Sequence, residues 1–177
     1  GVTLRLSAGA RSLGPNLGSG ANMNAIALAG PGQGWAVGRS GFIARLNAGA
    51  WSVWPAKPTT NELQSIALSG PNDGWAVGNS GAILRLAGGV WSDVSAGLRT
   101  EDITAIVLTG PNDGWAVGMD ETILRLSGGV WSLYRSDPLQ AGHHLYALAL
   151  NGPDAGWAAG AYHYAMQFSG GQWSVLE

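Results

Sequence analysis

The sequence contains no cysteine and few charged residues. Of its 177 residues, 9 are lysine or arginine and 11 are aspartate or glutamate, which gives a net charge of −2 at pH 7. Without cysteine there is no disulfide framework, no thiolate metal site and no cysteine nucleophile. So small a net charge offers no basic surface for a phosphate backbone, which argues against sequence-independent nucleic-acid binding.

Long apolar segments are absent as well. No apolar run approaches the ~20 residues that a membrane-spanning helix requires, and no signal-peptide pattern occurs. The chain starts at Gly1 instead of methionine, so we interpret it as a processed product or an excised piece. Low charge, together with abundant glycine, serine, asparagine and tryptophan, predicts an exported bacterial protein, extracellular or periplasmic.

Glycine and tryptophan are abundant, with 29 and 9 residues, and a repeat accounts for them. A Gly-Trp-Ala-Val/Ala tetrad recurs with tryptophan spacings of 40, 40 and 42 residues, and a second tryptophan follows sixteen residues later each time. The first tryptophans are Trp35, Trp75, Trp115 and Trp157, and the second are Trp51, Trp91, Trp131 and Trp173. A period of this length with strand signals in every unit is typical of a propeller or a solenoid.

Each unit is predicted to hold four short strands, which we call segments A to D. In the third unit, segment A is Ile106-Val107-Leu108, B is Trp115-Ala116-Val117-Gly118, C is Ile123-Leu124-Arg125-Leu126, and D opens with Trp131-Ser132. Glycine-rich turns separate the segments, and no stretch has a helical period. Segment A is apolar on both sides, which predicts burial on both faces of its sheet.

Four-stranded sheets packed face to face around an axis satisfy these patterns. The sequence therefore predicts an all-β fold, a small β-propeller whose blades each take about 40 residues. We expect a single domain over residues 1–177, with full repeats at about 23–54, 63–94, 103–134 and 145–177.

Residues 1–15 form an additional half blade. Leu4-Arg5-Leu6 precedes Ala44-Arg45-Leu46 by 40 residues, so this segment corresponds to C and D of a unit whose A and B are missing. Two strands with unpaired edges invite association unless something covers them. Three explanations remain open. A neighbouring molecule completes the fifth blade, the chain is cut from a longer one, or the half blade caps a ring of four blades, and the first two explanations are favoured.

The repeats resemble those of a known family. Asp73-Gly74-Trp75-Ala76-Val77-Gly78, then Gly81-Ala82-Ile83-Leu84-Arg85 and Gly88-Gly89-Val90-Trp91, is similar to the repeats of photosystem II assembly-factor propellers, and more distantly to bacterial neuraminidase repeats. The resemblance implies a propeller fold and, from the first family, a membrane-protein partner that no residue here identifies.

One departure from these families concerns the aspartate that neuraminidase-type repeats carry five residues before the second tryptophan. Its positions hold Leu46, Leu86, Leu126 and Phe168, so the turn it stabilises is lost or replaced.

The turns of the repeat differ in how variable they are. In a propeller, the D–A loops and B–C turns emerge on one face; here they differ between units and hold ten of the chain's twenty charges. Variable polar loops on a rigid scaffold are where specific recognition is built, although drift in unconstrained loops explains them too. We predict a partner-binding face there. Its candidate residues are Arg39, Lys57, Arg99, Asp120, Glu121, Arg135, Tyr162 and His163.

The alternative is a multivalent, lectin-like carbohydrate-binding propeller. The second tryptophan of each repeat begins the outermost strand, where we expect a half-exposed ring on which a sugar stacks, with turn residues as hydrogen-bond partners. Ordinary packing and turn formation explain the same residues. The candidate glycan contacts are Trp51, Trp91, Trp131, Trp173, Asn72, Asp73, Asn112 and Asp113.

Enzymatic activity is not expected. The adjacent acidic pairs, Glu101-Asp102 and Asp120-Glu121, both lie in predicted loops, and no Gly-x-Ser-x-Gly nucleophile elbow occurs. The arginines of segment C sit at one radius on successive blades, so they cannot converge on a single substrate, and we expect them to bridge neighbouring blades. They are Arg5, Arg45, Arg85 and Arg125.

A metal site and a cofactor are not expected either. His143, His144 and His163 are predicted to lie near one face, but adjacent histidines on an extended segment point to opposite sides. The sequence thus predicts a non-enzymatic binding or assembly module that recognises a protein partner and self-associates through its half blade.

Overall fold

The computed structural model describes the backbone of the following residues: 4–7, 10–13, 17–18, 22–98, 101–135 and 142–176. Over these residues the chain is all-β, with eighteen strands and three single-turn 3-10 segments. The predicted fold class is confirmed.

Sixteen of the strands form four antiparallel sheets of four strands each, and each sheet uses strands that are consecutive in the chain. We call these sheets blades 1 to 4. Blade 1 contains β3 (Met23–Gly30), β4 (Gln33–Gly38), β5 (Ile43–Asn47) and β6 (Ala50–Val53). Blade 2 contains β7 (Leu63–Gly70), β8 (Asp73–Gly78), β9 (Ile83–Ala87) and β10 (Val90–Asp93). Blade 3 contains β11 (Ile103–Gly110), β12 (Asp113–Gly118), β13 (Ile123–Ser127) and β14 (Val130–Arg135). Blade 4 contains β15 (Leu145–Leu150), β16 (Ala155–Gly160), β17 (Ala165–Ser169) and β18 (Gln172–Val175).

The remaining two strands form a separate sheet. β1 (Leu4–Ser7) and β2 (Ala10–Leu13) pair antiparallel, with Leu4 opposite Leu13. This two-stranded sheet is the half blade that the sequence predicts. Its completion by a neighbouring molecule stays a prediction.

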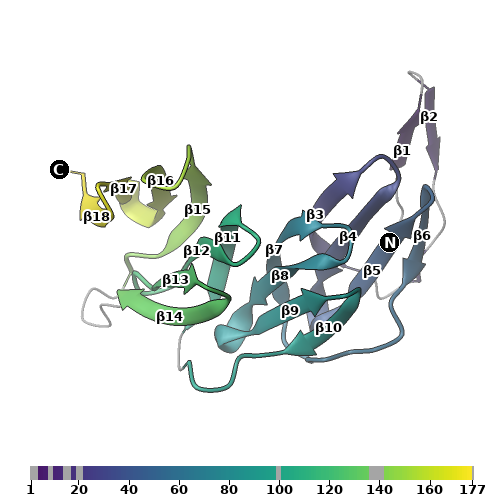
Figure 1. Ribbon diagram of the computed structural model, residues 1–177, viewed down its shortest axis with the longest axis horizontal. Coiled ribbons are helices and arrows are strands. Elements are labelled where there is room, and N and C mark those ends of the chain that lie inside the picture. Colours follow the sequence, from purple (N-terminus) through teal and green to yellow (C-terminus); the bar gives the residue numbers. More distant parts are fainter. Residues whose placement is uncertain are drawn as a thin grey trace.

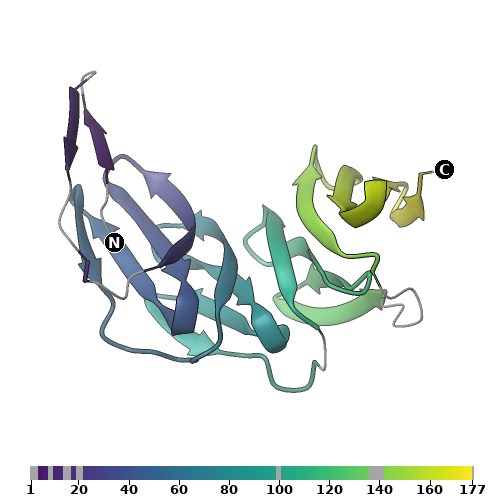
Figure 2. The ribbon, with the colours of Figure 1, turned by 180° about the vertical axis from the view of Figure 1, so that it is seen from behind.

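The blades follow one another in chain order along an arc. Their innermost strands contact each other in the order β3, β7, β11 and β15. Figures 1 and 2 show blade 1, with β1 and β2 beside it, at one end of the arc, and blade 4 with the C-terminus at the other. Each end blade therefore has one full blade as its neighbour, where a closed ring would provide two.

The hydrophobic core lies in the seams between successive blades. Each blade has a trailing face, which packs on the next blade in the chain, and a leading face, which packs on the previous one. The first seam joins a trailing face to a leading face through Trp35, Val37 and Ile43 on one side and Leu63, Ile66, Leu84, Leu86 and Trp91 on the other. The second seam repeats this composition at the equivalent positions, and the third has Met166 and Phe168 in place of two leucines.

Paired tryptophans connect the blades in every seam. Trp35 meets Trp91 edge to face with ring centroids 5.7 Å apart, and the next two seams repeat the contact at 5.7 and 5.8 Å. The segment C arginine lies over the ring of the first tryptophan, as Arg85 does over Trp75 at 4.8 Å. An aromatic pair and a cation–π contact thus share the first tryptophan of each seam. Both contacts stabilise the seam in addition to the apolar area that is buried there.

The prediction that segment A is buried on both faces holds in part. In blade 2 both faces of this strand pack in seams, Ile66 and Leu68 against blade 1 and Ala67 against blade 3, but only Ile66 is buried, and Leu68 and Ala67 are half-buried. Segment A forms the innermost strand of its blade, so no further strand covers its edge toward the axis.

Four equivalent glycines end segment B because another carbonyl passes directly beside them. A Cβ atom on Gly78 would lie 2.0 Å from the carbonyl oxygen of Glu62, the residue just before β7, and Gly38, Gly118 and Gly160 meet the same obstacle at 1.7 to 2.1 Å. Main-chain atoms cannot move aside as a flexible side chain can. Glycine at this position is therefore a packing requirement of every blade.

This requirement predicts a sharp difference between two glycines of blade 2. We expect Gly78→Ala to lower the free energy of unfolding by more than about 2 kcal/mol, because the added methyl overlaps a main-chain oxygen. Gly70→Ala, at the end of β7 with open space around the added Cβ, should change it by less than about 0.5 kcal/mol. Urea titrations followed by tryptophan fluorescence measure both values. Equal tolerance of the two substitutions would contradict the packing argument.

Candidate functional site

The B–C turns and D–A loops lie together on one face of the arc, which we call the loop face. In blade 1 the amide of Gly41 donates to the carbonyl of Asn61 at 2.8 Å, and in blade 3 the amide of Glu121 donates to the carbonyl of His143 at 2.9 Å. The B–C turns of blades 1 and 3 are thus tied to the end of the D–A loop that leads into the next blade. Since rigid strands hold both ends of these turns, the loop face is a defined surface.

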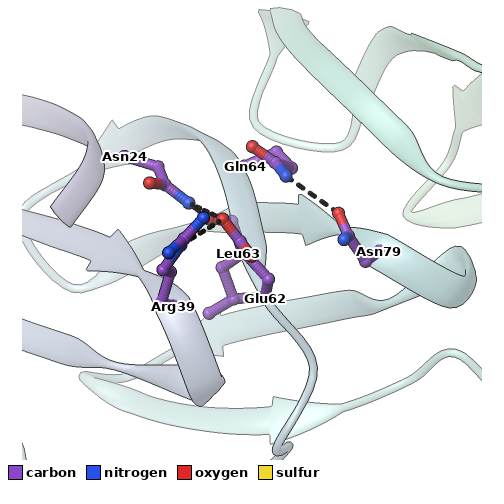
Figure 3. Close-up of polar contacts among 6 residues, drawn as sticks. All are labelled: Asn24, Arg39, Glu62, Leu63, Gln64 and Asn79. Atoms are coloured by element: carbon purple, nitrogen blue, oxygen red, sulfur yellow. Dashed lines mark hydrogen bonds and ion pairs between the residues drawn. The ribbon is translucent and has the colours of Figure 1, made fainter. Parts of the chain in front are cut away.

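At the seam between blades 1 and 2, the polar groups of the loop face bind one another. Asn24 donates through Nδ2 to the Oε1 atom of Glu62 and to the carbonyl of Leu63, each at 2.9 Å, and Arg39 Nε lies 3.3 Å from the same Glu62 oxygen (Figure 3). The Arg39 side chain is 63% exposed, so this ion pair contributes little to stability. Arg39 and Glu62 can therefore give up this ion pair for contacts with a partner protein at a small cost in free energy.

The seam between blades 2 and 3 uses the equivalent positions differently. The amide of Ser80 donates to Asp102 Oδ1 at 2.7 Å, where blade 1 has the Arg39–Glu62 pair. Gln64 donates to Asn79 Oδ1 at 2.9 Å within blade 2 (Figure 3). The candidate Arg99 lies outside the described residues. Lys57 is exposed on the loop that precedes blade 2.

A buried carboxylate sits at the seam between blades 3 and 4. The Glu121 side chain is 1% exposed, and its Oε1 atom lies 2.8 Å from the Arg135 guanidinium and accepts a hydrogen bond from the Tyr164 hydroxyl. Its second oxygen, Oε2, is buried and has no hydrogen-bond partner among the residues that the structure describes. A buried carboxylate is stable only when paired, and an unpaired buried oxygen carries a desolvation cost of about 1–3 kcal/mol.

Two histidines contact the neighbours of this carboxylate. The His143 ring stacks on the Tyr164 ring with centroids 4.2 Å apart, and its buried Nδ1 atom has no hydrogen-bond partner within the described part of the chain. His144 accepts from the Asp120 amide through Nδ1 at 3.2 Å and lies 3.5 Å from the Asp120 carboxylate. Glu121, Arg135, His143 and Tyr164, together with the adjacent Asp120–His144 pair, form what we call the Glu121 cluster.

The turns of blades 3 and 4 adopt a left-handed backbone without glycine. Asp120 and Glu121 have φ of 49° and 55°, where blade 2 places Ser80 and Gly81 at 54° and 67°. A left-handed residue other than glycine costs roughly 1–2 kcal/mol, so Glu121 is less stable at this position than the glycine of blades 1 and 2. Strain of this kind is found where function requires a particular side chain.

Blade 4 repeats the pattern with aromatic and imidazole side chains. Tyr162 and His163 have φ of 52° and 64°, and the Tyr162 side chain stands 84% exposed at the tip of the turn. Bulky residues rarely adopt such a φ. The repeat has serine at the same position in blades 1 and 2, so the ring is a specific departure on the loop face.

The structure groups some of the predicted partner-binding residues and separates others. Asp120, Glu121 and Arg135 meet in the Glu121 cluster, and Tyr162 and His163 occupy the next turn along the arc. Arg39 and Lys57 belong to the other end of the loop face, at blades 1 and 2. The grouping is an observation about position, and partner binding by these residues stays a prediction.

Sequence reasoning missed the role of Tyr164. It aligns with Phe42, Ala82 and Thr122 in the other repeats, so a comparison of the units shows a change there without indicating contact with Glu121. His143 and His144 were considered as metal ligands, yet each contacts an aromatic ring or an aspartate. Among the described residues no group of three or more metal-ligating side chains is close enough to hold an ion.

The expected exposure of the outer tryptophans is wrong for three of the four. Trp91, Trp131 and Trp173 are 4%, 8% and 5% exposed because each fills the seam against the preceding blade, and Trp51 is half-buried. A buried indole presents no ring face to a sugar. These residues therefore do not form the repeated stacking sites that the carbohydrate hypothesis requires.

The turn residues of that hypothesis form contacts on the face opposite the loop face. Asn72 accepts from Arg45 of the neighbouring blade at 3.0 Å, which is the bridge expected for the segment C arginines. Arg85 and Arg125 instead pair with the turn of their own blade, with Asp73 at 3.7 Å and Asp113 at 3.8 Å. Asn112 accepts through its carbonyl from the Gly129 amide at 2.9 Å.

The described part of the chain contains no helix with the length and apolar character needed to cross a membrane.

Comparison with known proteins identifies the fold. No family model matches the chain, and no curated protein matches it in sequence. Among solved structures, YCF48 bound to D1 peptide shares 19% identity at a TM-score of 0.63, over 86% of this chain and 53% of that one. Virginiamycin B lyase from Staphylococcus aureus shares 15% identity at a TM-score of 0.82, over 99% of this chain and 62% of that one. The WD40 β-propeller domain of Doa1 shares 11% identity at a TM-score of 0.67, over 90% of this chain and 55% of that one.

These likenesses confirm a β-propeller with repeats that resemble those of the photosystem II assembly factor YCF48. The chain spans a little over half of the length of the structures it matches. The neighbours include both a peptide-bound protein and a lyase, so the shared fold does not by itself decide the activity.

The strained turn of blade 3 predicts that Glu121→Gly is at least about 1 kcal/mol more stable toward unfolding than Glu121→Ala. Both variants lose the carboxylate and its contacts, but only glycine relaxes the positive φ at this position. Urea unfolding of both variants beside the parent chain measures the difference.

The same experiment separates two roles of Glu121. If the carboxylate is retained for recognition, Glu121→Gly should lose less than about 1 kcal/mol relative to the parent chain, because the 38% exposed Arg135 regains contact with water and the relaxed φ offsets part of the lost contacts. A loss of more than about 2 kcal/mol in Glu121→Gly would instead identify Glu121 as a structural element of the seam.

Proposed function

We propose that this protein is a non-enzymatic protein-binding propeller that receives its partner on the loop face of blades 3 and 4. The observation that carries the proposal is Tyr162, an 84% exposed ring held at a left-handed φ where the other turns of the loop face present serine or aspartate. The turn itself does not require the ring, because serine adopts the same left-handed φ at this position in blades 1 and 2.

Tyrosine is well suited to binding a protein. It buries a large area on association, loses little side-chain entropy and carries a hydroxyl that forms a hydrogen bond, so it is enriched among the residues that dominate binding energy. The turn has a defined backbone, which lowers the ordering cost of presenting the ring. Tyr162 therefore supplies the apolar anchor of the proposed interface.

The Glu121 cluster supplies polar groups beside this anchor. Arg135 is 38% exposed and reaches from Glu121 to the surface, so it is available to a carboxylate or carbonyl group of a partner. Asp120 and His144 are both about 30% exposed and form a second polar pair in the same region. An aromatic anchor bordered by partly exposed charged groups is the usual anatomy of a protein–protein contact.

Binding is favoured over catalysis by the state of these side chains. Within the described residues of the loop face, the acidic groups of the Glu121 cluster are paired with Arg135, Tyr164 and His144 rather than left facing open space. YCF48 in its solved structure holds a D1 peptide, which supports a peptide segment as the ligand class here. An exported location for this protein is part of the proposal.

The proposal predicts that Tyr162→Ser weakens partner binding at least tenfold, because the serine of blades 1 and 2 keeps the turn but removes the ring. Peptides selected from a random display library against the parent chain serve as probes, and their dissociation constants are measured by fluorescence anisotropy. Val130→Ser, a 69% exposed position on β14 beside the opposite turns, is the matched control and should leave the affinities unchanged.

Two results would count against the proposal. One is a selection that yields no peptide above background. The other is a set of peptides whose affinities fall equally in the Tyr162→Ser and Val130→Ser variants, which would place binding away from the loop face.

A further inference from the structure

The trailing face of blade 4 is uncovered where every other trailing face forms a seam. Trp157 is 49% exposed, whereas its equivalents Trp35, Trp75 and Trp115 are 0 to 3% exposed. Ala159 of the same strand is exposed, although the equivalent valines are fully buried. Blade 4 therefore presents an indole and its surroundings in the arrangement that elsewhere packs against a following blade.

The leading face of blade 1 is uncovered in the complementary way. Ile26 is 59% exposed, while Ile66 and Ile106 at the same position are 8% and 6% exposed. Leu28 beside it is 63% exposed. Trp51 is half-buried, whereas the other outer tryptophans are buried in their seams. The outer part of this face is covered in part, since Leu17 and Met23 pack on Ala36, Phe42 and Ala44.

We propose that a second copy of this chain docks head to tail, with the trailing face of blade 4 of one copy against the leading face of blade 1 of the other. The contact would reproduce part of the seam that the chain already forms three times within itself, at the positions of Ile26, Leu28 and Trp157 that stay exposed. Exposed apolar patches of this composition mark association sites. This inference concerns the ends of the arc and is independent of the loop face.

Hydrogen bonds of the first seam can be repeated across this contact. The Trp35 indole donates to the carbonyl of Pro71 at 3.0 Å, although the Trp75 and Trp115 indoles form no such bond among the described residues. Pro31 holds the place of Pro71 in the turn of blade 1, so the proposed contact offers its carbonyl to Trp157 of another copy. Asn24 and Thr104 bind the first carbonyl of the next blade at 2.9 and 2.5 Å. Tyr146, 51% exposed, holds that position in blade 4.

One copy cannot bring its own end faces together in this arrangement, because blades 1 and 4 lie at opposite ends of the arc (Figures 1 and 2). A second copy supplies both missing faces at once. Head-to-tail contacts of this kind close into a ring when the rotation permits, and continue as an open chain when it does not.

Light scattering of the 18.2 kDa chain after size exclusion, over micromolar concentrations, is the first measurement. We expect twice the monomer mass for a closed pair, or a mass that grows with concentration for an open chain. Trp157→Ser at one end and Ile26→Asp at the other should each weaken association at least tenfold, and the exposed-position control Val130→Ser should not. Circular dichroism confirms that each variant keeps its sheets.

Mixing the two end variants tests the direction of docking. Blade 4 of the Ile26→Asp copy and blade 1 of the Trp157→Ser copy are both intact, so the mixture should recover a pair with one good seam, although neither variant alone associates. A parent chain that runs at 18.2 kDa would overturn the proposal. So would association that survives both end substitutions, or a mixture that stays monomeric.

Discussion

The seam between successive blades is the interaction on which the rest of the structure depends. An isolated four-stranded sheet of this sequence would expose a tryptophan on its trailing face and a row of isoleucine, leucine and tryptophan on its leading face. Burial of a large aromatic side chain contributes a few kcal/mol, so a blade gains stability only through its neighbours. The same requirement accounts for the low charge of the chain, because both faces of each inner blade are removed from water.

The seams also determine where the chain is free to vary. The strands and the turns opposite the loop face repeat almost unchanged, and the glycine that ends segment B is kept in all four blades because a carbonyl passes beside it. The turns of the loop face are not subject to these packing requirements. Its turns in blades 3 and 4 replace glycine with side chains that strain the backbone, and they place the buried Glu121 and the exposed Tyr162 on neighbouring turns.

The two proposals follow from opposite kinds of departure from the repeat. Binding on the loop face rests on residues that the repeat does not require, such as Tyr162 with its strained and exposed ring. Head-to-tail docking rests on residues that the repeat does require but that find no following or preceding blade, such as Trp157 and Ile26. A propeller arc that exposes both kinds of surface can bind a partner and a second copy at the same time.

The sequence by itself determined the all-β propeller, the strand order of each blade and the half blade, because a 40-residue period with two tryptophans and fixed glycine turns admits few other folds. It also indicated which loops share a face, since that depends only on connectivity.

The tertiary structure alone decided the burial of the outer tryptophans. Whether a ring that begins an outer strand faces solvent or a seam depends on the neighbouring blade, and the period does not encode that choice. Likewise, the contact of Glu121 with Tyr164 joins residues of two blades, 43 positions apart, and no local pattern connects them. The uncovered faces of blades 1 and 4 are a property of the arc as a whole, since Trp157 and Ile26 are residues of the same type as those that the inner blades bury at these positions.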